Sequence, residues 1–473
     1  MNLSNTDTTR YLCAAAHLSK KFRDSVIEQI VQEEYKAIAV SHGVDLLTVV
    51  KHCFVAQKRE FIRDSLLALI FLLACVAYFY INVYLVLFVF FPTAVIIFFI
   101  TKWKARYITV AKGLARSSLN SDSLKFNPNT TEKIKIEKTA IEQNSNVIIY
   151  GGFSPFVGSG FDIGGWSFTL NLNKGREEIG RTIKPIEFEV EELYEYVVNA
   201  IRDLKLYGLS IEDKLCVNGQ EIRSNPVLLP DPFSRPRSQV DSEFVKKFIN
   251  TTGNHIRYYK HIKVISWNGE LIFSVFLRIL KINQRLFIET NYFVLTPVKN
   301  EYRLVDAIEP KMTLEKVVPL LIGSLWSGVS IWPFSVVFVL EKLDKKLKER
   351  KQRKKIKRII RETPNFNYGA INSVRELASS SEYNQYFQKL DKEMYLKIIQ
   401  RQLIDSLVEF LEIKNIDISE LKERRTAIFN NGVIVSGGSI KATNLSVGEK
   451  AKAVFGELVQ SNMFKTEALQ QDK

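Results

Sequence analysis

The longest apolar run of the chain, residues 65–101, contains no charged residue and lies between Asp64 and Lys102. As a single helix it would extend roughly 55 Å at about 1.5 Å per residue, whereas the hydrocarbon core of a bilayer is only ~30 Å thick. The run therefore predicts a transmembrane hairpin of two short helices. Its turn is expected at residues 80–84, where tyrosine side chains would lie at the membrane interface.

Basic residues flank this hairpin on both sides and predict its orientation. Because cytoplasmic loops carry an excess of lysine and arginine, both ends of the hairpin are expected on the cytoplasmic side. The flanking residues are Lys58, Arg59, Arg63, Lys102, Lys104, Arg106, Lys112 and Arg116. The prediction is a multi-pass protein of the bacterial inner membrane, with both termini in the cytoplasm and almost nothing outside.

A second apolar run, residues 317–340, is long enough to cross a membrane once. A single crossing would place the basic segment that follows on the outer side, against the positive-inside rule. Pro319, Gly323, Gly328 and Pro333 also divide the run into short pieces. We expect a re-entrant or interfacial segment that contacts the membrane. A tight two-pass hairpin and a segment of a soluble core are the alternatives.

The N-terminal part, residues 1–63, is expected to be a helical cytoplasmic segment. Apolar residues recur there at helical spacing around residues 8–18, 20–40 and 44–63.

The middle of the chain, residues 102–316, is expected to form a cytoplasmic mixed α/β domain. Residues 133–143, KIKIEKTAIEQ, alternate like a strand, and residues 189–206 carry the apolar stripe of an amphipathic helix. Residues 255–297 contain three β-rich runs, the first two separated by Asn-Gly, which is a preferred two-residue hairpin turn. These runs predict an antiparallel meander of three strands.

The C-terminal part is predicted to be helical, with a β-rich tail. Residues 341–429 indicate a basic helix and then an amphipathic region that favours a local helical bundle. Residues 430–473 begin with short strands between Gly, Ser and Asn corners, which is typical of stacked β-arches; a disordered tail is the alternative. Such a tail would gain most by stacking on a copy of itself, so we expect self-association through it. The predicted fold class is an α+β membrane protein.

The glycine-rich stretch at residues 151–165 is the strongest candidate for a ligand site. A dinucleotide-binding loop needs GxGxxG between a strand and a helix, because the helix N-terminus holds the phosphate. Here the glycines are spaced one residue too far apart and an alternating strand follows, so strand, loop and strand are expected. A loop that binds a ligand through backbone amides is the alternative. Its candidate residues are Gly151, Gly152, Ser154, Gly158, Ser159, Gly160 and Asp162.

The charge of the chain points to an anionic partner. The formal net charge is +15, which suits either an anionic membrane surface or nucleic acid. The very basic stretch at residues 342–361 follows an apolar segment and has no interleaved aromatic residues, so phospholipid headgroups fit it better than nucleic acid. The residues expected to contact lipid headgroups are Lys345, Lys346, Lys351, Arg353, Lys354, Lys355 and Arg358.

No sequence pattern indicates catalysis or a metal site. The four cysteines form no CxxC pair, and His17, His42 and His52 lack the spacing of metal ligands. No nucleophile and base occur at a recognisable spacing. We therefore predict no catalytic residue, no metal and no cofactor.

Three segments carry a resemblance to a known family: RYLCAAAHLSKKF near the N-terminus, YGGFSPFVGSGFDIGGWSF in the middle and NNGVIVSGGSIKATNLSVGEKAKA near the end. They resemble a family of bacterial membrane proteins, common in actinobacteria, with two transmembrane segments. The resemblance implies a membrane protein and brings no assigned activity. The tail is also similar to glycine-corner β-motifs of some bacterial defence and signalling proteins, which implies homotypic assembly.

Two functional hypotheses follow from these expectations. The main one is a non-enzymatic sensor or effector that acts on the inner membrane from the cytoplasmic side, perturbs it in antiphage defence, and works with a partner protein encoded nearby. The alternative is a membrane-anchored ligand-binding module or enzyme that acts on a nucleotide or a lipid headgroup.

Overall fold

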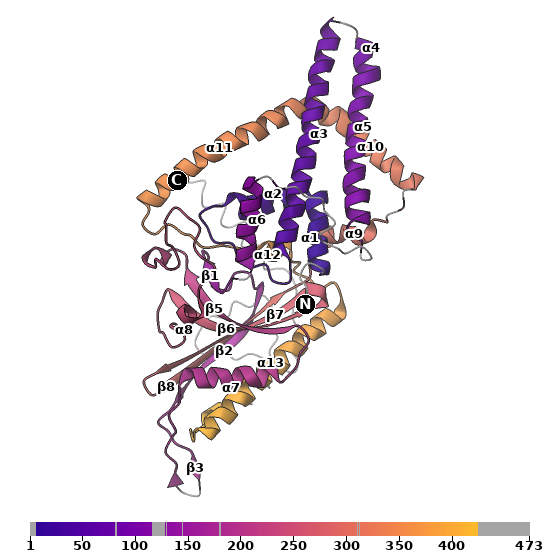
Figure 1. Cartoon of the computed structure of the whole chain (residues 1–473). Coiled ribbons are helices and arrows are strands. Elements are labelled where there is room, and N and C mark those ends of the chain that lie inside the picture. The colour runs from indigo at the N-terminus through magenta and orange to yellow at the C-terminus, as the bar shows by residue number, and fades with distance from the viewer. Residues whose placement is uncertain are drawn as a thin grey trace, which may run out of the picture. The chain divides into compact units, whose positions relative to one another are not determined.

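The chain folds as an α+β protein in a computed structural model (Figure 1). The structure describes residues 6–80, 83–115, 128, 130–143, 145–178, 181–309, 311 and 313–423. The chain divides into two compact units. Unit 1 comprises Met1–Phe161, Lys205–Ser274 and Val294–Tyr395, and unit 2 comprises Asp162–Leu204, Val275–Phe293 and Leu396–Lys473.

Two capped helices open the chain. The hydroxyl of Thr6 accepts a hydrogen bond from the amide of Thr9 and caps the N-terminus of α1, Asp7–Leu18. Ser19 caps α2, Lys20–Val26, in the same way, and α2 continues into the π-helical turn η2, Ile27–Gln32.

The helix predicted over residues 20–40 is wrong in its second half, because helical structure ends at Gln32. The segment that follows makes tertiary contacts instead. The amide of Ala37 donates to the carbonyl of Tyr368 at 2.8 Å. Pairing with a distant segment therefore replaces the last helical turns.

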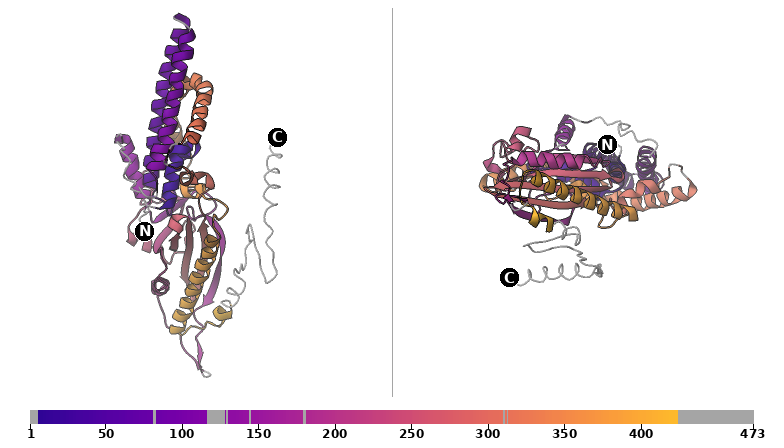
Figure 2. Two further views of the ribbon diagram at one scale, coloured as in Figure 1. Left: turned by 90° about the vertical axis from the view of Figure 1, so that its right-hand side faces the viewer. Right: turned by 90° about the horizontal axis from the view of Figure 1, so that it is seen from below.

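The predicted hairpin forms from two long helical arms. The first arm, α3, Leu46–Tyr80, starts within the N-terminal segment and runs into the apolar stretch without a break. The second arm consists of α4, Val83–Leu85; η3, Val86–Phe90; α5, Phe91–Trp103; and η4, Lys104–Lys112. α3 ends at Tyr80 and α4 begins at Val83, and both residues lie within the range predicted for the turn. In two perpendicular views α3 and α5 lie side by side (Figure 2).

The second apolar run forms a bent pair of helices. These are α10, Leu314–Ser330, and α11, Ser335–Glu362, joined by η10, Trp332–Phe334. The run bends by 49° at its break, as the prolines and glycines in it predict. Within unit 1, α10 packs against α5 and α11 packs against α3.

The strands form one six-stranded sheet in the order β1-β5-β6-β7-β8-β2. They are β1, Val147–Tyr150; β2, Phe161–Asn171; β5, Leu209–Asn218; β6, Ile256–Ser266; β7, Leu271–Ile282; and β8, Arg285–Leu295. β1 runs parallel to β5, and β5 runs antiparallel to β6, so the sheet is mixed. β7 lies inside the sheet, and its first ten residues are buried.

The predicted meander is confirmed as three successive neighbouring strands, β6, β7 and β8. The predicted two-residue Asn-Gly turn is wrong, because four residues separate β6 from β7. Three of them form a 3₁₀ turn, η8, Trp267–Gly269, with all three at positive φ. Only Asn283 and Gln284 separate β7 from β8, a connection short enough to join antiparallel strands only.

The glycine stretch joins two strands, as predicted, but the strands are not neighbours. β1 lies at one edge of the sheet and β2 at the other. The loop at residues 151–160 thus connects the two edges of the sheet.

The strand predicted at residues 133–143 is wrong, because the segment forms α6, Thr130–Gln143. Its Lys, Glu, Ala and Gln residues favour helix, and the alternation of isoleucines covers only four residues. The helix places Ile136 against the core of the N-terminal helices, and the Gln143 side chain donates to the carbonyl of Val44 at 3.1 Å.

Helices of unit 2 pack through aromatic side chains. The predicted amphipathic helix is confirmed as α7, Val190–Arg202, and the C-terminal half of α13, Tyr386–Ile413, also belongs to this unit. The rings of Tyr196 on α7 and Phe410 on α13 lie 5.4 Å apart, and the hydroxyl of Tyr194 accepts a hydrogen bond from the amide of Ile279 on β7.

Short elements complete the fold. They are β3, Glu177–Glu178; β4, Arg181–Thr182; η7, Ile222–Ser224; α8, Ser242–Lys246; η9, Asn300–Arg303; α9, Leu304–Ala307; and α12, Val374–Ala378. The β-arch tail predicted for residues 430–473 lies outside the described residues.

Candidate functional site

The two arms of the hairpin carry an apolar surface that the described chain does not cover. The helical segments Leu46–Tyr80 and Phe88–Lys112 are each long and apolar enough to cross a membrane. The bent pair of helices would be a third such segment if its two helices together form a single span. Phe79 and Phe88, near the turn, are 77% and 75% exposed. Further exposed apolar side chains are Leu66, Leu69, Leu73, Val76, Val89, Ile96 and Ile100. Contiguous apolar surface of this kind marks an interaction site.

Polar contacts hold the bent pair on the hairpin. The ammonium of Lys102 donates to the carbonyl of Gly323 at 2.6 Å and to the hydroxyl of Ser327 at 2.7 Å. The indole of Trp332 donates to the carbonyl of Leu67 at 3.2 Å. Gly328 allows close approach, since a Cβ there would lie 3.0 Å from a methyl of Val95. The second apolar run thus packs on the first.

A buried carboxylate marks the basic end of the hairpin. Asp64 is only 5% exposed and directly precedes the uncharged run. Its carboxylate accepts from the Arg63 guanidinium at 2.7 Å and from the Lys342 ammonium at 2.8 Å. The pair with Lys342 connects α3 to the beginning of the basic part of α11.

The residues predicted to contact lipid headgroups lie along α11. Lys351, Lys354 and Lys355 are exposed. Arg353 pairs with Glu34 at 2.5 Å, and Arg358 pairs with Glu362 at 2.7 Å. The side chains of Lys345 and Lys346 lie outside the described part of the structure. Lipid contact by this set stays a prediction.

The C-terminal end of α11 is held by a loop of unit 1. Lys357 and Arg361 lie over the ring of Phe233, at 5.9 and 5.4 Å from its centroid. The Arg223 guanidinium donates to the carbonyls of Thr363 and Pro364, just beyond the helix. Part of the positive charge of the basic helix therefore serves to anchor it on this chain.

The glycine loop holds a carboxylate of its own chain. The amides of Gly158 and Gly160 both donate to one carboxylate oxygen of Glu376, at 2.7 and 3.0 Å. The other oxygen accepts the amide of Ser373 at 2.8 Å, and the Ser373 hydroxyl accepts the Glu376 amide. The Glu376 carboxylate therefore has two roles. One oxygen forms the capping box of α12, and the other occupies the anion site formed by the loop amides.

Close backbone packing explains two of these glycines. Gly158 and Gly160 have φ of +99° and +91°, and a Cβ on them would lie 2.5 Å from the carbonyl oxygen of Val40 and 2.4 Å from that of Val294. Any residue other than glycine would clash there.

The other predicted ligand residues of the loop make separate local contacts. The amide of Gly151 donates to the carbonyl of Ala370, and Asp162 accepts the amide of Gly164. Gly152 and Ser154 are exposed, whereas Ser159 is buried. An external anion at Gly158 and Gly160 would have to displace Glu376, so ligand binding by this loop stays a prediction.

Sequence reasoning missed a buried arginine next to this loop. The guanidinium of Arg375 is fully buried and donates to the carbonyls of Glu270 at 2.9 Å and Thr296 at 2.7 Å. Burial lowers the pKa of Arg375 to about 10, partly offset by the nearby Glu270 carboxylate. Arg375 fixes α12 against the meander. The capping-box pattern S-x-x-E at Ser373 was the one sequence signal for this region.

Sequence reasoning also missed a histidine pair. Arg59 donates to Nδ1 of His17 at 3.2 Å, and Nε2 of His17 lies 2.9 Å from Nδ1 of His52. Because a guanidinium only donates, the neutral His17 ring carries its proton on Nε2 and donates it to His52. Among the described residues no group of three or more His, Cys, Asp or Glu side chains is arranged to hold a metal ion.

These features define an α+β protein with a mixed sheet and two helices that are long and apolar enough to cross a membrane. The model of a family described as AbeC-like domain matches residues 165–442, more than half of the chain. The chain therefore belongs to the AbeC-like domain family. The two long apolar helices precede the matched region. No curated protein and no solved structure matches the chain.

Proposed function

We propose that this protein is a membrane-anchored, non-enzymatic effector of antiphage defence that acts from the cytoplasmic side of the bacterial inner membrane. The observation that carries the proposal is the exposed apolar surface of the hairpin arms. Membership of the AbeC-like domain family supports the association with abortive infection.

The depth of the hairpin in the membrane follows from its charges. α3 is 35 residues long, roughly 50 Å, and exceeds the ~30 Å hydrocarbon core. Its uncharged part begins after Asp64, and that of the other arm ends before Lys102. The apolar half of α3 lies in the bilayer, and the half before Asp64 lies in the cytoplasm with α1 and α2.

The orientation rests on basic residues at the same end of both arms. Arg59, Arg63, Lys102 and Lys104 lie at this end, and Lys342 joins them through Asp64. The positive-inside rule places this end in the cytoplasm. The 49° bend in the second apolar run and its packing on α3 and α5 support a re-entrant segment that returns to the same side.

An effector of this architecture acts by association of hairpins. One hairpin encloses no pore, so perturbation of the membrane requires several copies. The tail at residues 430–473 is the segment that we propose brings them together.

The test is expression of the full chain in bacteria that are then challenged with phage. The wild-type protein is expected in the membrane fraction after carbonate extraction, and the membrane potential is expected to collapse after infection. The variant Leu69→Arg/Leu73→Arg places two charges at exposed apolar positions of α3, each costing up to about 3 kcal/mol within the bilayer, and should lose both properties.

The matched control is Tyr207→Arg/Ile371→Arg, which adds the same charge at side chains that are 80% and 63% exposed outside the hairpin. It should behave like the wild type. Recovery of the wild-type protein in the soluble fraction would overturn the membrane anchor. An intact membrane potential in infected cells that hold the protein in their membranes would overturn the effector function.

A further inference from the structure

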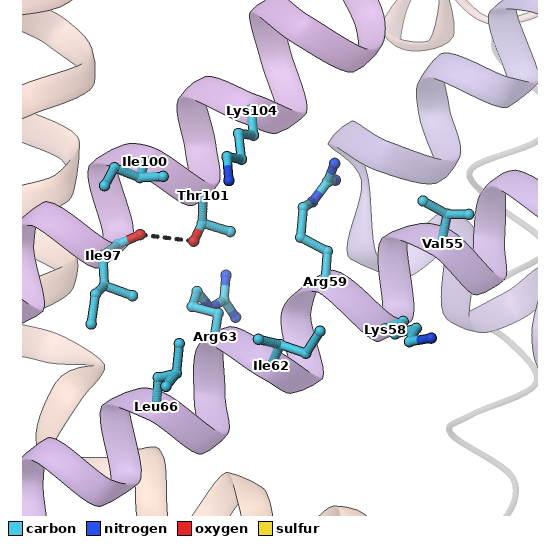
Figure 3. A pocket seen from close by; sticks show the side chains of 10 residues that line it. All are labelled: Val55, Lys58, Arg59, Ile62, Arg63, Leu66, Ile97, Ile100, Thr101 and Lys104. Atoms are coloured by element: carbon cyan, nitrogen blue, oxygen red, sulfur yellow. Dashed lines mark hydrogen bonds between the residues drawn. The ribbon is translucent and has the colours of Figure 1, made fainter. Parts of the chain in front are cut away.

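A pocket of about 560 Å³ lies between α3 and the arm formed by α5 and η4 (Figure 3). Both walls belong to unit 1 and to the hairpin. The lining residues are Val55, Lys58, Arg59, Ile62, Arg63, Leu66, Ile97, Ile100, Thr101 and Lys104.

Positive charge dominates the polar part of this pocket. Four of the lining residues are cationic, and no acidic side chain is among the described residues that line it. Arg59 and Arg63 point from α3, and Lys104 points from η4, into the gap between the two helices (Figure 3). Cations on facing helices repel each other, so this arrangement favours an anion between them.

Several of these cations have hydrogen-bonding capacity left for a ligand. Among the residues that the structure describes, Lys58 and Lys104 have no ion-pair partner. Arg59 donates to His17 and Thr109 through its two terminal nitrogens, and neither acceptor carries a negative charge that would neutralise it. Arg63 forms an ion pair with Asp64, and the same carboxylate also pairs with Lys342. The pocket therefore keeps a net positive charge.

Apolar side chains of the lining continue from the cations into the uncharged runs. Along α3, Leu66 follows Arg63, and along the other arm, Ile97 and Ile100 precede Lys104. Ile62, Leu66 and Ile100 are 50%, 47% and 41% exposed. The pocket thus has a cationic end toward the cytoplasm and an apolar end toward the bilayer.

We infer that this pocket binds the phosphate of an anionic phospholipid, with the acyl chains along the apolar end. Basic pockets between helices on the cytoplasmic side of a membrane suit such headgroups, and guanidinium groups suit phosphate oxygens. A free phosphate would satisfy the cations but leave the apolar lining uncovered, so the geometry favours the lipid. The inference rests on the proposed membrane anchor, because only an inserted hairpin meets the ligand at this depth.

The test measures binding of phosphatidylglycerol to the full chain in neutral detergent micelles by native mass spectrometry. Each cation near a membrane surface contributes about fivefold in affinity. Lys104→Gln should therefore weaken binding about fivefold, and Lys58→Gln/Lys104→Gln about 25-fold. Both lysines are exposed, so these changes should leave the fold intact.

The matched control is Arg106→Gln, which removes an exposed cation two residues from Lys104 that does not line the pocket. Phosphatidylglycerol affinities of the two lysine variants equal to that of the Arg106 control would overturn the site. Equal wild-type affinity for phosphatidylcholine would overturn its selectivity for anionic lipid, and equally tight binding of glycerol 3-phosphate would overturn the lipid in favour of a free phosphate. Carbonate extraction of the same variants separates these results from failure of the membrane anchor.

Discussion

At the scale of single residues, two backbone amides of the glycine loop create an anion site that a carboxylate of the same chain occupies. The amides of Gly158 and Gly160 converge because positive φ turns both toward Glu376. The sequence shows the glycines, yet their occupant comes from a residue more than two hundred positions away. A glycine-rich loop is thus no evidence for a phosphate ligand until its amides are traced to their acceptor.

Substitution of one loop glycine should be costly, and substitution of another should not. Gly158→Ala forces a residue with a side chain to φ +99° and brings its Cβ to 2.5 Å from the Val40 carbonyl oxygen. We expect a loss of about 2 kcal/mol or more in the free energy of unfolding, measured by denaturant titration of the full chain. Gly152→Ala, where no atom lies within 4 Å of the added Cβ, is the control. Equal losses in the two variants would contradict the packing role of Gly158.

Buried histidines should make the stability fall in mild acid. Burial lowers the pKa of His17, His42 and His261 well below 6.5, and Lys263 and Lys214 add to this effect at His42. The unfolded chain binds protons near pH 6.5 and the folded chain does not, so stability is complete above pH 6.5 and declines below it. Between pH 7.5 and 5.5 each such histidine should cost about 1.4 kcal/mol.

The measurement is the free energy of unfolding at these two pH values. His42→Gln should reduce the loss of unfolding free energy between pH 7.5 and 5.5 by about 1.4 kcal/mol. Substitution of the exposed His255 should leave this loss unchanged. A pH dependence that does not differ between wild type and His42→Gln would rule out the contribution of His42.

At the scale of elements, the Asp64 carboxylate joins α3 and α11, which lie far apart in the sequence. Asp64 ends the basic part of α3 and holds Lys342 of α11. Without it, the cations Arg63 and Lys342 face each other at the basic end of the hairpin. The start of α11 should then separate from α3.

Asp64→Asn should therefore loosen the contact between α3 and α11. We expect a loss of about 2 kcal/mol in stability, because the buried partner of two cations becomes neutral. Faster hydrogen exchange of the amides at residues 335–345 is the measurement. Asp344→Asn, which removes only an exposed pair with Lys348 on the same helix, should leave this exchange nearly unchanged. Unaltered exchange in Asp64→Asn would show that apolar packing alone holds the helices.

At the scale of the whole molecule, the family match and the apolar helices fall on different parts of the chain. The matched region begins at residue 165, after the hairpin, and includes the bent pair of helices. The hairpin thus supplies the proposed anchor, and the matched region extends into the tail that we propose for assembly.

Removal of residues 424–473 should separate anchoring from assembly. The shortened chain should stay in the membrane fraction, because the proposed anchor lies in the hairpin. Its mass in detergent, measured by light scattering, should fall from an oligomer to a monomer. An unchanged oligomer would contradict assembly through the tail, and loss of the protein from membranes would show that the tail also supports the fold.

The sequence alone determined the elements that rest on long local patterns. The uncharged run, the three-strand meander and the amphipathic α7 follow from hydrophobic length and periodicity, which neighbouring residues fix among themselves. Residues 133–143 form a helix and not the predicted strand, because helix propensity and packing on α3 outweigh a short alternation of isoleucines.

Only the tertiary structure decided which segments, distant in the sequence, are neighbours in the fold. It placed β1 and β2 at opposite edges of the sheet, seated Glu376 in the glycine loop and brought Arg59, Arg63 and Lys104 around one pocket. The physical reason is common to all three. Hydrogen bonds and charge pairs between segments far apart in the chain leave no periodicity in the sequence, because each depends on where the backbone returns.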